Sequence, residues 1–152
     1  MRFDEFKPGM QIDCGSRLIS EEEILAFARR YDPQWFHVDM ARAQDGRWNG
    51  LIASGWMTCC IAMDLVVRSV LAGSESFGSP GIDELRWETP VRPGDTLRVM
   101  VTVLDSRVSS SGRNGILRWR WEIHTQRNQR VMNLIAVSLF DIGNSGAGAG
   151  VR

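Results

Sequence analysis

Residues 54–71 read SGWMTCCIAMDLVVRSVL, and this stretch decides the fold. Five of its residues recur at helical spacing, namely Ile61, Ala62, Leu65, Val66 and Ser69. A helix of this length is about 27 Å long, at about 1.5 Å per residue. Further apolar residues extend the stripe around most of the circumference, and a helix of that kind is usually enclosed by the rest of the protein. The stretch therefore predicts one long buried helix, with Gly73 as its C-terminal stop.

Four consecutive antiparallel strands are predicted after this helix. The clearest is 116–124, in which apolar and polar side chains alternate as they do in a strand with one buried face. Residues 131–140 are apolar on both faces, which is typical of a central strand. The four predicted strands are 82–91, 96–105, 116–124 and 131–140.

The chain before the long helix predicts one strand and one short helix. Residues 10–18 form the strand. Ser20 then opens the helix, because Ser20 and Glu23 have the spacing of a capping box. Pro33 disfavours helical geometry at Asp32, so we expect the helix to end just before it.

The order of these elements predicts the fold class. Residues 32–50 are expected to be irregular, with at most one helical turn around 40–44. A strand, a short helix, a loop, a long helix and four strands together predict an α+β fold, in which one antiparallel sheet covers a single long helix. We expect one domain over residues 1–142 and a flexible, glycine-rich tail over 143–152.

The composition argues against several classes of protein. Lys+Arg and Asp+Glu both number 18, so no net charge draws the chain to nucleic acid or to an anionic membrane. A membrane span needs about 20 nearly uncharged residues, and Asp64 and Arg68 interrupt the longest apolar stretch. The charged N-terminus is unlike a signal peptide. Three cysteines without a C-x-x-C, and only two histidines, predict a reducing cytoplasm and no metal site.

Several residues suggest packing rather than chemistry. Cys59 and Cys60 are interpreted as small apolar core residues of the long helix, in preference to nucleophiles. Trp87, Trp119 and Trp121 are interpreted as core or interface anchors. The chain has no G-x-S-x-G elbow and no Walker loop.

Residues 31–39, YDPQWFHVD, carry the richest set of reactive groups. They place two carboxylates, an amide and one of the two histidines in a loop, where reactive groups are often found. Asp32 and His37 converge if the backbone turns between them, and such a pair can hold a water molecule and take its proton. From spacing alone the simpler interpretation is stronger, in which the Asp caps a turn and the His is only hydrogen-bonded.

Residues 50–57, GLIASGWM, lead into the long helix. Ser54 can cap that helix. The first amides, around Gly55 and Trp56, can bind negative charge that develops on a carbonyl oxygen. Gly55 also lets a ligand approach the backbone closely. Every helix has such an end, so this segment by itself predicts only a helix cap.

Taken together, these segments resemble the MaoC-like dehydratase family, which includes the R-specific enoyl-CoA hydratases. The family signature is Asp-x-Asn-Pro-x-His, followed by Gly-x-x-x-His/Ser-Gly at the start of the hot-dog helix. Asp32 and His37 keep the spacing of the first element, and 50–55, GLIASG, matches the second. Residues 85–97, LRWETPVRPGDTL, are similar to the family's Pro-Val-x-x-Gly-Asp-Thr strand pair. The resemblance spans residues 5–141.

The resemblance implies a hot-dog fold and a hydro-lyase that adds water to, or removes it from, an enoyl thioester. Asp32 and His37 would hold the water against C3 and deliver a proton to C2. Backbone amides near Gly55, flanked by Ser54 and Trp56, would bind the enolate oxygen. The substrate would be an acyl-CoA or acyl-carrier thioester; no cofactor is expected, since coenzyme A is part of the substrate. Family members are dimers or larger with sheets joined edge to edge, so a homodimer or larger homo-oligomer is expected.

Two positions depart from the signature and keep two alternatives open. Gln34 replaces the family's Asn and adds one methylene to a polar group of the site, and Trp35 replaces its Pro and adds bulk beside Asp32 and His37. Both are expected to be substrate-binding residues, and they leave the shape of the substrate open. One alternative is a hot-dog thioesterase, a class that commonly places a carboxylate on the long helix, where Asp64 is the only acid. The other is a non-catalytic subunit that binds an acyl thioester. The departures from the signature at Gln34 and Trp35 suggest this alternative.

Overall fold

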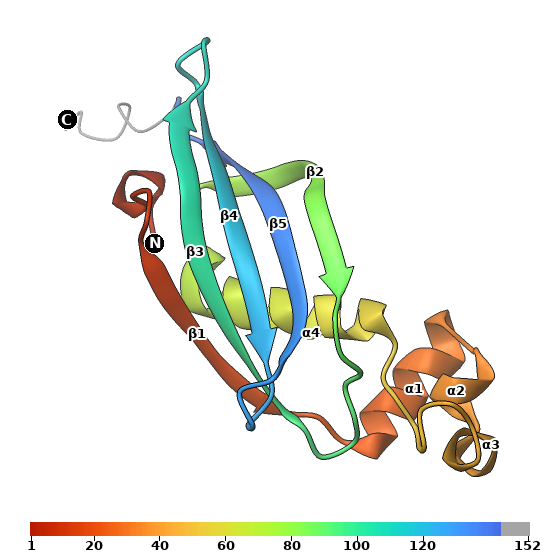
Figure 1. Cartoon of the computed structure of the whole chain (residues 1–152). Coiled ribbons are helices and arrows are strands. Elements are labelled where there is room, and N and C mark those ends of the chain that lie inside the picture. Colours follow the sequence, from red (N-terminus) through yellow and green to blue (C-terminus); the bar gives the residue numbers. More distant parts are fainter. Residues whose placement is uncertain (144–152) are drawn as a thin grey trace.

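A five-stranded antiparallel sheet curves around one long helix in the computed structural model, which describes residues 1–143 (Figure 1). The helix is α4 (Gly55–Val66), continued by the π-helical segment η2 (Val67–Leu71). The strand order in the sheet is β1-β3-β4-β5-β2. The strands are β1 (Gln11–Leu18), β2 (Ser76–Trp87), β3 (Thr96–Val108), β4 (Asn114–His124) and β5 (Arg130–Asp141). This arrangement confirms the predicted α+β hot-dog fold.

Three short helices lie beside the N-terminal end of α4 (Figure 1). They are α1 (Glu21–Tyr31), α2 (Trp35–Val38) and α3 (Met40–Gln44), and a short 3-10 helix, η1 (Phe3–Glu5), precedes β1. The predicted capping box is present, because Ser20 Oγ accepts from the amide of Glu23 at 3.1 Å and Glu23 Oε2 accepts from the amide of Ser20 at 3.0 Å.

The core lies between the sheet and α4. The inward side chains predicted for β3 and β4 are all buried, and the helix residues Met57, Ile61, Ala62 and Val66 pack in the same cluster. The buried side chains of the two strands are Leu97, Val99, Val101, Val103, Leu117, Trp119, Trp121 and Ile123. Full burial of such a side chain contributes about 1.5–3 kcal/mol, so this layer fixes the helix against the sheet. Residues 1–143 include no helix long and apolar enough to cross a bilayer.

Two elements differ from the prediction. Helix α2 falls in a region expected to be irregular, because a single turn is too short to give a periodic pattern. Strand β2 begins at Ser76 rather than at residue 82. The early start was not predicted because Gly78, Pro80 and Gly81 are residue types that are uncommon in strands. The pairing of β2 with β5 is irregular at three places along this strand. Of the predicted tail, 143–152, only Gly143 lies within the described residues.

The three cysteines, all within the described residues, are free. Cys59 is half-buried and Cys60 is exposed, so the prediction of a core position is wrong for Cys60, which lies on the open side of α4. Burial raises the pKa of Cys59 to about 11. Since a thiol with that pKa carries almost no thiolate near neutral pH, Cys59 is a poor nucleophile.

Removal of the Ser20 hydroxyl tests the capping box that starts α1. We expect Ser20→Ala to lower the free energy of unfolding by about 1 kcal/mol, because one amide at the helix start loses its acceptor. Urea denaturation of the purified variant measures the change. Ser110→Ala, at an exposed position in the β3–β4 turn, is the control and should have almost no effect. Equal losses in both variants would contradict the capping role.

Candidate active site

Asp32 lies at the C-terminal end of α1, and two side chains donate hydrogen bonds to its carboxylate. Ser54 Oγ donates to Oδ2 at 2.7 Å, and Gln34 Nε2 donates to Oδ1 at 2.8 Å. Partial burial by itself would raise the pKa of Asp32, but these two hydrogen bonds and the nearby His37 together hold it below its ordinary value. The carboxylate is therefore ionised near neutral pH.

His37 lies on α2 and its side chain is 6% exposed. Its Nδ1 is 2.7 Å from the carbonyl oxygen of Ile52. Because a carbonyl oxygen can only accept, Nδ1 carries a hydrogen and Nε2 is the basic nitrogen of the neutral ring. Nε2 is 3.3 Å from Asp32 Oδ2. While the ring is neutral, His37 Nε2 and Asp32 Oδ2 are both hydrogen-bond acceptors and have no hydrogen between them. Either a proton on Nε2 or a water molecule that donates to both atoms supplies the missing hydrogen bonds.

Ser54 differs from the expectation of a helix cap. Its hydroxyl makes no capping hydrogen bond to the amides of α4 and donates to Asp32. The first amides of α4, those of Gly55 and Trp56, have no carbonyl one helical turn earlier with which to pair. They are therefore available to a ligand, as the sequence predicts for the start of this helix.

A cavity of about 350 Å³ lies next to this group. His37 and Gly55 both line it, whereas Asp32, Ser54, Gln34, Trp35 and Trp56 do not. Most of the cavity wall was not predicted from the sequence, including Phe36, Trp48, Thr58, Trp87 and Val131. These residues come from two helices, a turn and two strands, so no local pattern marks them as a group. The one available signal was the 85–97 segment, which includes Trp87 and the wall residues 88–91.

The two residues that depart from the family signature have different positions. Gln34 is exposed, and its amide holds the Asp32 carboxylate. Trp35 lies away from the pair, since its indole packs where a Cβ on Gly46 would be and the Arg42 guanidinium stacks 4.6 Å from its ring centre. Trp35 therefore does not add bulk beside Asp32 and His37, as the sequence had suggested.

The indole of Trp56 also lies outside the cavity and is 56% exposed. It meets Trp87 edge to face, with ring centres 5.1 Å apart. Asp64, the acid on the long helix, is half-exposed and pairs with Arg68 at 2.8 Å. It lines a different cavity from His37. In the described part of the chain, no three His, Cys, Asp or Glu side chains are grouped to hold a metal ion.

Comparisons with known proteins agree with this fold. Residues 5–119 match the MaoC like domain, so the chain belongs to that family. It is 34% identical to the MaoC-like dehydratase of Rhodospirillum rubrum, whose structure aligns with a TM-score of 0.83 over 91% of this chain and 94% of that one. The uncharacterized protein YdeM of Bacillus subtilis is 36% identical over 107 residues, which cover 70% of this chain and 76% of that protein.

A more distant structure shares the fold alone. R-hydratase PhaJ1 of Pseudomonas aeruginosa is 20% identical, with a TM-score of 0.74 over 91% of this chain and 84% of that one. Protein MaoC of Klebsiella aerogenes is 28% identical over 142 residues, but the match covers only 40% of that longer protein. The family assignment therefore rests on the match of residues 5–119 to the MaoC like domain.

The hydrogen bond from Gln34 gives a test of the site's electrostatics. We expect a carbon-detected NMR titration to give Asp32 a pKa below about 3.9, the ordinary value, and Gln34→Ala to raise it. A lowered pKa in the folded state stabilises the fold above the unfolded-state value, and this stability is lost as the pH falls through the folded-state pKa. Gln126→Ala, which removes a donor to Asp95, is the matched control. An Asp32 pKa that does not respond to Gln34→Ala would contradict this description.

Proposed function

We propose that this protein adds water to the C2–C3 double bond of an enoyl thioester, or removes water in the reverse direction. The observation that carries the proposal is the contact of His37 Nε2 with Asp32 Oδ2 at 3.3 Å, beside a cavity that Gly55 also lines. A water molecule that donates to both atoms would be held by two bases at once. The amide of Gly55 would face the thioester end of a substrate in the cavity.

The reaction follows from these positions. The dyad takes a proton from the water as its oxygen bonds to C3, and the π electrons move toward the thioester oxygen. The amide of Gly55 stabilises the enolate oxygen that forms, an interaction whose removal typically costs about 100-fold to 1,000-fold in rate. The proton held by the dyad then passes to C2, which completes the addition. Dehydration is the same sequence in reverse.

Two structural neighbours have names that describe hydration or dehydration, which supports this chemistry. One structural neighbour is the R-hydratase PhaJ1 of Pseudomonas aeruginosa, and another is the HadBC 3R-hydroxyacyl-ACP dehydratase of Mycobacterium tuberculosis. Both are 20% identical or less, so we take from them the class of reaction for the proposal and not the identity of the acyl group. The name of the HadBC dehydratase gives a thioester on a carrier protein. Coenzyme A esters serve as the probes below.

The two alternatives have less support from the site. A thioesterase would use a carboxylate of the long helix, but Asp64 is paired with Arg68 and lies outside the cavity of His37. A non-catalytic subunit was suggested by Gln34 and Trp35. Gln34 donates to Asp32 at 2.8 Å, and Trp35 packs elsewhere, so neither change disturbs the dyad.

Substitution of the dyad tests the proposed reaction. We expect Asp32→Asn and His37→Ala each to lower kcat/KM for crotonyl-CoA hydration by about 100-fold to 10,000-fold, because each removes a group that moves the proton. Loss of absorbance by the enoyl thioester measures hydration. A thiol reagent in parallel assays detects release of coenzyme A.

The control is Asp39→Asn, which replaces another carboxylate of the same segment. Asp39 lies at the N-cap of α3 and not in the dyad. Circular dichroism of each variant checks that the fold persists. Full activity in both dyad variants, or release of coenzyme A in place of hydration, would refute the proposal.

We also propose that the chain acts as a homodimer. One face of the long helix is exposed and mostly apolar, and its residues recur every three or four positions at Trp56, Cys60, Met63 and Val67. Strand β2 is an edge strand of the sheet, and Phe77 and Ile82 on it are exposed. Exposed apolar surface and an open sheet edge are both typical of an interface between subunits.

A charge in the middle of this helix face tests the dimer. We expect light scattering to give the wild-type protein twice the mass of one chain, and Met63→Glu to shift it toward the monomer, because a buried unpaired carboxylate is costly. Val108→Glu, which changes an exposed apolar residue at the end of β3, is the control. A monomeric wild-type protein, or a dimer that survives Met63→Glu unchanged, would contradict the proposal.

A further inference from the structure

Trp87 forms the wall of the cavity at the start of α4. Its indole lies so close to Gly55 that a Cβ atom there would be 2.5 Å from Trp87 Nε1, well inside van der Waals contact. Trp87 and Gly55 both line the cavity, and Trp56 packs against the edge of the same indole. An acyl group whose carbonyl meets the amide of Gly55 must therefore run along the Trp87 ring.

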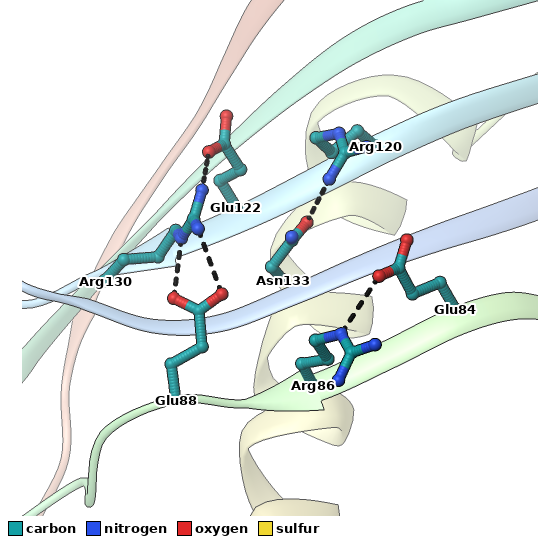
Figure 2. Close-up of polar contacts among 7 residues, drawn as sticks. All are labelled: Glu84, Arg86, Glu88, Arg120, Glu122, Arg130 and Asn133. Carbon is teal, nitrogen blue, oxygen red and sulfur yellow. Dashed lines mark hydrogen bonds and ion pairs between the residues drawn. The ribbon is translucent and has the colours of Figure 1, made fainter.

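The next residue, Glu88, is held on the opposite face of the sheet. Arg130 Nε and Nη2 donate to the two carboxylate oxygens of Glu88 at 2.7 and 3.0 Å, and Nη1 donates to Glu122 at 2.7 Å. Figure 2 shows Arg130 between these two acids, on the face turned away from α4. The Glu88 amide also donates to the carbonyl of Val131 at 2.9 Å. Both the side chain and the backbone of Glu88 are thus fixed.

This ion pair contributes geometry more than stability. Arg130, Glu88 and Glu122 have side chains that are 39%, 28% and 27% exposed, and ion pairs at such positions contribute little to the free energy of folding. A two-pronged contact between a guanidinium and a carboxylate nevertheless fixes the orientation of both groups. Trp87 is the last residue of β2, in which side chains alternate between the two faces, and Glu88 follows it directly. Holding Glu88 outward therefore favours the position of Trp87 on Gly55, where its side chain is still 46% exposed.

We propose that Trp87 determines which acyl chains the cavity accepts, and that Arg130 is a positioning residue that holds Trp87 in place through Glu88. The inference rests on the proposed function for its substrate class. Arg130 lies on the far side of the sheet and touches no substrate, so its effect on acyl selectivity passes through Trp87.

Two substrates of different chain length test the role of Trp87. The ratio of kcat/KM for trans-2-octenoyl-CoA to that for crotonyl-CoA is measured in the wild-type protein and in Trp87→Leu. We expect the ratio to rise at least fivefold in Trp87→Leu, mainly through KM, because the smaller side chain opens the wall to the longer chain. Trp87→Phe, which keeps a smaller ring, should give an intermediate ratio and covers the case in which the Leu variant does not fold.

A double-mutant cycle tests the link to Arg130. We expect Arg130→Gln to change the ratio in the same direction as Trp87→Leu, and Arg130→Lys, which keeps the charge, to restore part of the wild-type value. In the Trp87→Leu background, Arg130→Gln should leave the ratio unchanged, because the residue it positions is gone. The control is Arg118→Gln, which removes a similar ion pair, that of Arg118 Nε with Asp83 at 2.6 Å, farther along β2 on the same face.

Binding measurements separate this inference from the proposed function. Calorimetry with the saturated esters butyryl-CoA and octanoyl-CoA gives a ratio of affinities that needs no turnover. If hydration fails but this ratio changes in Trp87→Leu and Arg130→Gln as described, the proposed function is wrong and the role of Trp87 stands. An unchanged ratio in both Trp87 variants, equal effects of Arg130→Gln and Arg118→Gln, or an undiminished effect of Arg130→Gln in the Trp87→Leu background would overturn the inference.

Discussion

The hydrogen bond from Ser54 Oγ to Asp32 Oδ2 joins two parts of the chain that are 22 residues apart in sequence. It connects the end of α1 to the start of α4, so the carboxylate is brought to the same place as the first free amides of the buried helix. The Ser54 side chain is fully buried, and in such surroundings a hydroxyl needs a partner. Without this contact, Asp32 would lose a donor and the helix start would lose its link to His37.

A second contact completes the same arrangement. The carbonyl of Ile52 fixes the Nδ1 hydrogen of His37, and the amide of Ile52 in turn donates to the carbonyl of Phe36 at 3.3 Å. The loop that leads into α4 therefore orients the ring and selects the nitrogen that faces Asp32. The long helix matters for function mainly because it gives these loops a rigid base, which is where reactive groups are best positioned.

Much of the fold could be predicted because its signals are local. The alternation of Leu117, Trp119, Trp121 and Ile123 comes from one segment and was confirmed. The apolar pattern of 54–71 correctly predicted a long helix, but one face of that helix is exposed rather than enclosed. The shape of the site could not be predicted in this way. Trp35 adjoins the dyad in sequence but packs toward Gly46, whereas Trp87 is remote in sequence and lies on Gly55. Such contacts depend on how separate elements pack, and no periodicity encodes them.

Solvent deuterium in the product tests the central claim most directly. The protein is incubated with crotonyl-CoA in D₂O, and the product is returned to H₂O and analysed by mass spectrometry. The account predicts a 3-hydroxyacyl-CoA with a single non-exchangeable deuterium at C2, which Asp32→Asn forms at least about 100-fold more slowly. Free coenzyme A with unchanged crotonate, or a hydroxy product formed equally well by Asp32→Asn, would contradict it.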